Sequence, residues 1–272
     1  MAQVTSLEKV LKKRKLAPSK FSDIIKKIIH PMLLGLSKSK IGYEIVNCSE
    51  NKIDFNTGRP ILFAVNHGTS FDIPIALNII KAHTYLLAGK QPLEKMDETF
   101  FNLNGTIYVD RKNKEDMGLS KEAMIEYLNS GQNILFFPEG TWNMTDSNPM
   151  LEMKWGIIDV AQRANALIVP IALDYDYDNR ICRYSIGKSI DVNNISLSNG
   201  IEIVRNELAT LKWKLFELKE RLVRENVDLE SERSKIFHSV EEYPKLDYDY
   251  EQSVVYHSVP TPDDVFRPNR RK

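Results

Sequence analysis

The strongest constraint on the fold is a strand-like run that leads directly into a helical pattern, at residues 61–80. Residues 61–65 are all apolar and predict a buried strand, and small or polar residues interrupt the pattern at 66–70. Apolar side chains then recur at the spacing of one helix face, at Ile73, Ala76, Leu77 and Ile80. In α/β folds, ligands bind beyond the carboxyl ends of the strands. His67 and Asp72 therefore lie where a ligand is expected.

The rest of the chain repeats this alternation of strands and helices. Further strands are predicted at 43–46, 53–55, 85–88, 106–109, 134–137 and 167–173, and 182–186 is expected to be an edge strand. Helices are predicted at 72–81, 92–103, 114–129 and 154–165. The pattern predicts an α/β fold with a mainly parallel sheet covered by helices on both faces. Pro170 predicts a bulge or an edge position within its strand.

Composition and periodicity divide the chain into four parts. Residues 1–40 predict a basic amphipathic helical membrane-surface segment, and 41–198 the main domain. Residues 199–225 predict one long helix, with leucines at steps of three and four. We expect this helix to pack on the domain, and a dimer seam is the alternative. Residues 226–272 are acidic and contain prolines, which predicts a solvated tail that is irregular or partly ordered.

The N-terminal helix pattern is both apolar and basic. One predicted face carries Phe21, Ile24, Ile25, Ile28, Ile29, Met32, Leu33 and Leu36. Lysines fall elsewhere on the wheel, and Pro31 predicts a kink. This pattern favours a helix that lies in the interface of an anionic membrane. The alternative is a helix docked on the protein's own core with its lysines outward.

Composition argues against several other classes. The chain has 37 basic and 37 acidic residues, and apolar residues interleave with its basic N-terminus, so nucleic-acid binding is not expected. No apolar run reaches the roughly 18 residues that a membrane-spanning helix needs, and no signal peptide is evident. Cys48 and Cys182 form no disulfide framework, which favours a reducing compartment. The histidines are scattered, so no metal site is predicted, and phosphate-loop and dinucleotide fingerprints are absent.

The pair His67 and Asp72 fits general base catalysis. Histidine takes a proton from a hydroxyl near neutral pH, and it does so well when a carboxylate holds its other ring nitrogen. Asp72 lies five residues after His67, close enough across one tight turn to do this. The alternative is structural: a histidine that caps the helix, and an aspartate that the helix dipole stabilises.

The segment Asn66-His67-Gly68-Thr69-Ser70-Phe71-Asp72 resembles the Asn-His-x4-Asp box of the glycerolipid acyltransferases, the lysophosphatidic acid acyltransferase family. Three further segments resemble that family's other boxes, in the family's order: 105–111, 137–141 and 168–172. Together they cover about residues 60–175. The resemblance implies that 41–198 is an acyltransferase domain with the HxxxxD motif.

The resemblance also implies roles for individual residues. His67 and Asp72 become the catalytic pair, and Arg111 the ligand of the acceptor's phosphate. The other implied substrate-binding residues are Asn66, Glu139, Gly140, Thr141 and Lys154. The surface alternative for Arg111 is pairing with Asp110 or Asp116.

The chain departs from the family's third box at Trp142, where that box usually continues with arginine. Trp142 brings a simple lysophosphatidate acceptor into question, because an aromatic side chain replaces a phosphate-binding cation. It could stack on a sugar, line an acyl groove or pack in the core. Lys154 could supply the missing cation, or could be a solvated surface lysine.

The implied function is phospholipid biosynthesis by an O-acyltransferase, peripheral on the cytoplasmic face of a membrane. His67 would act on a lysophospholipid hydroxyl, such as that of lysophosphatidic acid, with acyl-CoA or acyl carrier protein as the acyl donor and no cofactor. Donors near residues 68–70 are candidates for stabilising the oxyanion. The alternatives are a different lipid-linked or glycolipid hydroxyl acceptor, and a lipid-binding module without turnover.

Overall fold

The computed structural model describes residues 10–11, 14, 16–90, 95–143, 149–219 and 226–241, and these are built around one seven-stranded sheet. Its strands lie in the order β1-β7-β6-β2-β5-β3-β4. Their bounds are β1 Glu44–Asn47, β2 Ile61–Val65, β3 Thr84–Gly89, β4 Thr106–Val109, β5 Asn133–Phe136, β6 Leu167–Asp176 and β7 Ile181–Ile186. Five of the six pairings are parallel, and β6 pairs with β7 antiparallel. The predicted mainly parallel sheet is therefore confirmed.

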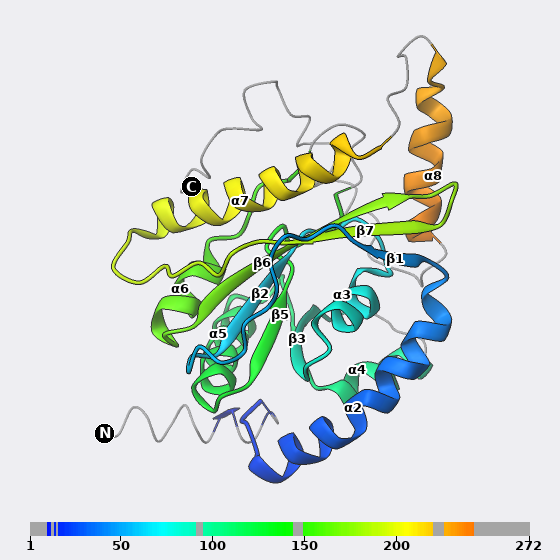
Figure 1. Ribbon diagram of the computed structural model, residues 1–272. Coiled ribbons are helices and arrows are strands. Elements are labelled where there is room, and N and C mark those ends of the chain that lie inside the picture. The colour runs from blue at the N-terminus through cyan, green and yellow to red at the C-terminus, as the bar shows by residue number, and fades with distance from the viewer. Residues whose placement is uncertain are drawn as a thin grey trace.

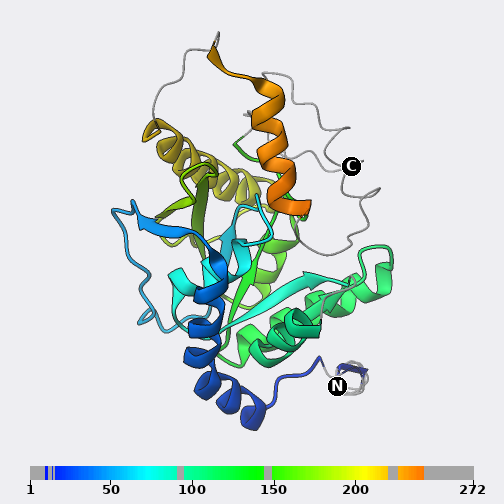
Figure 2. The ribbon, with the colours of Figure 1, turned by 90° about the vertical axis from the view of Figure 1, so that its right-hand side faces the viewer.

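Helices cover both faces of the sheet, as Figures 1 and 2 show. Successive side chains of β2 point to opposite faces because a strand is pleated. Leu62 and Ala64 enter one buried cluster with apolar residues of α5 (Lys114–Asn129), α6 (Gly156–Arg163) and α7 (Leu197–Glu217). Phe63 enters the other cluster, with residues of α2 (Lys20–Ile41), α3 (Asp72–Ile80) and α4 (Lys95–Asn104). The two clusters form the core on either side of the sheet.

Several local predictions need correction. Residues 53–55 form no strand. The strand predicted for 182–186 is β7, which lies between β1 and β6, so β1 rather than β7 is the edge on that side. The long helix α7 ends at Glu217. The helix α8 (Leu229–Glu241) is an ordered part of the segment that was predicted to be irregular or partly ordered. Residues 242–272, most of that acidic tail, lie outside the described residues.

Pro170, where the sequence predicted a bulge or an edge, lies opposite a bulge in the segment 187–189. It pairs with Ala64 of β2 on one side. On the other side, the β6–β7 ladder begins with the pair Ile171 and Ile186, and an isolated bridge joins Ile168 to Ile190. Between these two pairings, the two residues 169–170 face the three residues 187–189. The Gly187 N–H donates to the Pro170 carbonyl at 2.9 Å. Because proline has no N–H, a bulge at this point leaves no ladder donor unpaired.

The helix α2 docks through one stripe and exposes an apolar one. Leu33 and Ile41 are buried, together with the polar residues Asp23, His30 and Ser37. The exposed stripe consists of Phe21, Ile24, Ile25, Ile28, Met32 and Leu36, with Phe21 75% and Ile28 72% exposed. The helix continues through Pro31. In Figure 1, α2 runs along the outside of the domain beside α4.

The described cations of the N-terminal segment do not all face solvent. Arg14 pairs with Glu115 and Asp116 of the domain, and Lys26 is half-buried. Lys20, Lys27 and Lys38 are exposed. The lysines at 9, 12, 13 and 15 and the side chain of Lys40 lie outside the described residues. Among the helices that the structure describes, none combines the length and hydrophobicity needed to cross a bilayer.

Candidate active site

The parallel strands bring the first three sequence boxes to one end of the sheet, whereas the fourth, residues 168–172, lies within β6. His67 follows β2, Arg111 follows β4, and residues 137–141 follow β5, while Tyr175 lies near the end of β6. These strands run in the same direction through β2–β5, β5–β3, β3–β4 and β2–β6 pairing. Their carboxyl ends therefore meet, as the α/β rule predicts for a ligand site.

The side chains of His67 and Asp72 make the predicted contact. Nδ1 of His67 lies 2.7 Å from Oδ2 of Asp72, whose side chain is fully buried at the start of α3. The backbone N–H groups of Gly68 and Thr69 donate to the same oxygen, at 2.6 and 2.9 Å. These two donors are thus engaged with Asp72 rather than left for an oxyanion. The Nδ1 contact leaves Nε2 as the nitrogen that can take a proton from a substrate.

Sequence reasoning missed Tyr175, which completes the support of Asp72. Its hydroxyl donates to Oδ1 of Asp72, and the residue is 4% exposed. Burial, followed by the neighbouring Asp72 charge, raises the pKa of Tyr175 well above its ordinary value, so the hydroxyl stays a donor. Its place near the carboxyl end of a buried strand beside β2 is the sequence signal that could have found it.

The imidazole of His67 is held between aromatic rings. It stacks on Phe137 with ring centroids 4.2 Å apart, and Trp142 lies tilted against it at 5.3 Å. The side chain of His67 is 15% exposed. The ring is therefore fixed in orientation by the Asp72 contact at one edge and by packing on its sides.

Glu139 holds the backbone of the loop that carries His67. Its Oε1 accepts from the backbone N–H of His67 and its Oε2 from that of Leu151, both at 2.8 Å. The residue is 2% exposed, and burial raises the pKa of Glu139 to about 7, although the two N–H groups lower it. Both oxygens already hold backbone groups, so this geometry favours positioning of His67 over the predicted direct contact with the acceptor.

Asn66 is also tied to the protein. Its Oδ1 accepts from the Leu173 N–H at 2.6 Å, and its Nδ2 donates to the Leu173 carbonyl at 3.1 Å. The side chain thereby extends the pairing of β2 with β6 past Val65. Asn66 does not line the cavity beside His67, and its predicted contact with substrate remains a prediction.

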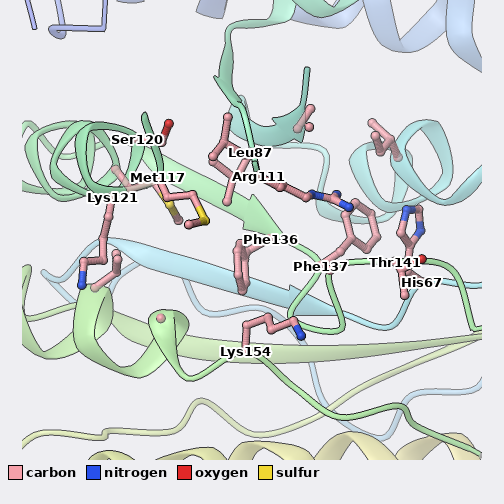
Figure 3. A pocket seen from close by; sticks show the side chains of 18 of the residues that line it. His67, Leu87, Arg111, Met117, Ser120, Lys121, Phe136, Phe137, Thr141 and Lys154 are labelled. Atoms are coloured by element: carbon pink, nitrogen blue, oxygen red, sulfur yellow. The ribbon is translucent and has the colours of Figure 1, made fainter. Parts of the chain in front are cut away.

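A cavity of about 570 Å³ opens beside His67, and Figure 3 shows its lining. Besides His67, four residues predicted from the sequence line it: Arg111, Gly140, Thr141 and Lys154. Most of the remaining wall is apolar and includes Leu87, Val109, Met117, Met124, Phe136 and Val160. The cavity can therefore place a charged head group near His67 and an alkyl chain along the apolar wall.

Gly89 and Gly140 lie beside the two cationic side chains Arg111 and Lys154. A Cβ at Gly89 would lie 3.4 Å from the guanidinium of Arg111. Gly140 has a φ of 75°, and a Cβ there would lie 3.6 Å from the Lys154 side chain. Asp116, one of the alternative partners suggested for Arg111, binds Arg14 and Lys90. In the described part of the chain, no three His, Cys, Asp or Glu side chains gather where they could hold a metal ion.

Comparison with known proteins gives a consistent result. The family model Acyltransferase matches residues 47–174. A lyso-ornithine lipid O-acyltransferase of Pseudomonas aeruginosa is 27% identical over 120 residues, which cover 44% of this chain and 45% of that protein. A 1-acyl-sn-glycerol-3-phosphate acyltransferase of Neisseria meningitidis is 25% identical over 185 residues, 63% of each chain. The chain thus matches between about half and two thirds of the length of these relatives.

A solved structure shares the fold. The 1-acyl-sn-glycerophosphate (LPA) acyltransferase PlsC from Thermotoga maritima superposes with a TM-score of 0.56 at 15% sequence identity. The match covers 82% of this chain and 98% of that one.

Proposed function

We propose that the chain is a glycerolipid acyltransferase like the relatives it matches, and that it moves a fatty acyl group from a thioester donor to a lysophospholipid hydroxyl. The observation that carries the proposal is the contact of 2.7 Å between Nδ1 of His67 and the buried Asp72 carboxylate. It is the arrangement a histidine needs to act as a general base. The donor is acyl-CoA or acyl carrier protein, bound as a substrate, and no cofactor enters the reaction.

The proposed reaction needs no acyl-enzyme intermediate. Nε2 of His67 takes the proton of the acceptor hydroxyl while the hydroxyl oxygen attacks the thioester carbonyl carbon. Asp72 stabilises the imidazolium that forms. The tetrahedral intermediate then expels the thiolate, which receives the proton back from His67. Arg111 and Lys154 bind the anionic head group of the acceptor, and the apolar wall of the cavity holds an alkyl chain.

We also propose that the protein works on a membrane surface. The support is the exposed apolar stripe of α2, because monomeric soluble proteins rarely expose contiguous apolar patches of this kind. Lys20 and Lys27 are exposed on the same helix and would attract anionic lipids. With two free cysteines as a further indication, we place the protein peripherally on the cytoplasmic face.

The decisive experiment is an acyl-transfer assay with the His67→Ala variant. The 272-residue chain is given acyl-CoA or acyl carrier protein donors and an acceptor panel that includes lysophosphatidic acid, glycerol phosphate and neutral glycolipids. We expect His67→Ala to lose at least about 10²-fold in rate, since a general base contributes about 10²- to 10⁴-fold. His238→Ala, an exposed histidine of α8, is the matched control and should keep full activity. Turnover that persists in His67→Ala would overturn the proposed mechanism.

A second candidate keeps the chemistry and changes the acceptor. Trp142 stands where the family's third box usually has arginine, and one relative is named a lyso-ornithine lipid O-acyltransferase. Transfer that requires His67 but fails with every phosphate-bearing acceptor in the panel would favour a different lipid-linked hydroxyl.

A further inference from the structure

The carboxyl end of β6 extends beyond the end of its neighbour β2. The last pair of these two strands is Val65 with Ile171, whereas β6 continues to Asp176. Past this pair, the carbonyl groups on the β2 side of β6 have no strand partner, and a buried carbonyl needs a donor. Nδ2 of Asn66 donates to the Leu173 carbonyl at 3.1 Å. The other donors to this part of β6 come from the opposite direction, from α7.

Two lysines of the α7 region bind the end of β6. Nζ of Lys212 donates to the Leu173 carbonyl at 2.5 Å, and Nζ of Lys219 donates to the Tyr175 carbonyl at 2.9 Å. Asp174 lies between these two carbonyls. Its Oδ1 is 2.9 Å from Nζ of Lys212 and its Oδ2 is 2.7 Å from Nζ of Lys219. The two lysines therefore attach the end of β6 to α7, which lies across one face of the sheet in Figure 1.

The ion pair between Asp174 and Lys212 is largely buried. The side chain of Asp174 is 3% exposed and that of Lys212 is 12% exposed. Although burial raises the pKa of Asp174, the charges of Lys212 and Lys219 lower it below its ordinary value, so the carboxylate stays charged. Removing two charges from water costs so much that a buried ion pair adds little net stability. The geometry that this pair enforces is the better explanation for its place.

The end of β6 holds the loop of His67 at both of its ends. Leu173 exchanges two hydrogen bonds with the side chain of Asn66, the residue directly before His67. The hydroxyl of Tyr175 donates to Asp72, the carboxylate that contacts Nδ1 of His67. A shift of this part of β6 would therefore move the start of the loop and the carboxylate at its end together.

We propose that Lys212 is a positioning residue for the proposed acyl transfer, on which this inference rests. Its ammonium group fixes residues 173–175 of β6, and this segment fixes the two ends of the loop that carries His67. Lys212 does not line the cavity beside His67, so it acts through these contacts rather than by binding substrate. Lys219 adds a second attachment, but its side chain is 35% exposed, so Lys212 is the more informative residue to change.

The test is a kinetic comparison of Lys212→Met with the unchanged chain, using the donor and acceptor that give the highest turnover in the panel. Methionine keeps an unbranched side chain but removes the ammonium group. A misplacement of about 1 Å in an active site can cost about 10²-fold, and for this indirect contact we expect kcat to fall about 10-fold, with the KM of the acceptor nearly unchanged. Lys212→Arg keeps the charge and N–H donors and should recover most of the lost kcat. Lys214→Met, the same change at an exposed position of α7, is the matched control and should keep wild-type kinetics.

A second control separates positioning from a general loss of stability. Leu208→Ala removes a fully buried side chain of α7 and leaves both lysines in place. It should lower the free energy of unfolding, measured by urea denaturation, and leave the kcat of the folded protein close to wild type. If Leu208→Ala lowers kcat as much as Lys212→Met does, the packing of α7 supports the site in general and the inference is overturned.

A double-mutant cycle with Tyr175→Phe tests the path of the effect. If Lys212 acts through the segment that carries Tyr175, the two changes disturb the same contact to Asp72, and their effects on kcat are not independent. We expect the variant that combines Lys212→Met and Tyr175→Phe to lose little more kcat than the worse of the two single variants. Effects that multiply in full would overturn the inference.

The outcomes separate this inference from the proposed function. Thermal unfolding checks that each variant is folded, and if Lys212→Met is not, Lys212→Gln takes its place and should show the same loss of kcat. A wild-type kcat in the charge-removing variant overturns the inference and leaves acyl transfer intact. So does a raised KM of the acceptor at constant kcat, because that result would indicate substrate binding. Absence of any transfer that depends on His67 overturns the proposed function and the inference with it.

Discussion

At the scale of single residues, the site depends on side chains that fix other side chains. Asp72 orients His67, Tyr175 donates to Asp72, and Glu139 holds the backbone of His67. In the proposed reaction the substrate contacts His67 but does not contact Asp72, Tyr175 or Glu139. Their removal should therefore affect kcat more than the KM of the acceptor.

The first residue-scale prediction concerns Tyr175. Tyr175→Phe removes one donor from a buried carboxylate, and a hydrogen bond to a charged group contributes about 1.5–3 kcal/mol. We expect a fall in kcat of roughly tenfold and a lower free energy of unfolding, measured by steady-state kinetics and urea denaturation. Tyr184→Phe, a half-buried tyrosine of β7, is the control. Wild-type kinetics in Tyr175→Phe would show that Asp72 does not need this donor.

The second concerns Glu139 and decides between two roles for it. Glu139 accepts hydrogen bonds from the N–H groups of His67 and Leu151, one at each carboxylate oxygen. Glu139→Gln replaces one of these oxygens by an NH2 group, so one of the two backbone N–H groups loses its acceptor. We expect a drop in kcat with the KM of the acceptor nearly unchanged. Glu152→Gln, an exposed glutamate of the same loop region, is the control. A rise in the acceptor's KM at constant kcat would restore the substrate-binding role implied by the family resemblance.

At the scale of elements, α2 reverses the usual arrangement of a surface helix. Its polar Asp23 and His30 are buried, whereas Phe21 and Ile28 face outward. Periodicity alone located the apolar face but could not say which way it points. The structure shows that α2 docks on the domain, through the stripe that carries few of its apolar residues. Its place in a membrane interface stays a prediction.

The element-scale prediction is that this exposed stripe holds the protein on lipid. Ile28→Asp removes an apolar contact that contributes about 1.5–3 kcal/mol when buried, so binding to vesicles of mixed anionic lipids should weaken about tenfold or more. Sedimentation with vesicles measures this effect. Ser39→Asp, which adds the same charge at an exposed position near the end of α2, is the control. If Ile28→Asp and Ser39→Asp weaken vesicle binding equally, the added negative charge explains the loss and the apolar stripe does not hold the protein on lipid.

At the scale of the whole molecule, two buried histidines are in contact between α2 and the start of β3. His30 and His83 contact edge to face with ring centroids 5.4 Å apart, and Nε2 of His83 donates to the Asn104 carbonyl at 2.7 Å. Burial is the main cause that lowers the pKa of His83 to about 4, and the nearby His30, Lys26 and Lys27 lower it further. Burial also lowers the pKa of His30.

These shifts predict a loss of stability in acid. Between pH 6.5 and about 4, His83 is protonated in the unfolded chain but stays neutral in the folded protein. The unfolded chain therefore binds more protons, and the free energy of unfolding falls as the pH falls. For His83 the loss is on the order of 3 kcal/mol by pH 4. Urea unfolding of His83→Gln across this range should show a flatter pH dependence than wild type. The control is His238→Gln, at an exposed position of α8, which should show the pH dependence of the wild type. If His83→Gln also shows the wild-type pH dependence, the buried His83 does not destabilise the folded protein in acid.

Sequence determined the fold class, most strand and helix positions, and the pair His67 and Asp72, because all of these depend on residues close together in the chain. Hydrophobic periodicity is a local property, and the tight loop between β2 and α3 needs contacts across only five residues. The bulge at Pro170 followed for the same reason, since a missing N–H belongs to the residue itself.

Tertiary structure alone decided which distant groups share the site. Tyr175 reaches Asp72 across 103 residues, and Glu139 reaches His67 across 72. The interior place of β7, the outward stripe of α2 and the burial of Thr141 and Trp142 likewise depend on what packs against each element. No local pattern encodes these contacts, because burial and pairing arise only when separate parts of the chain meet.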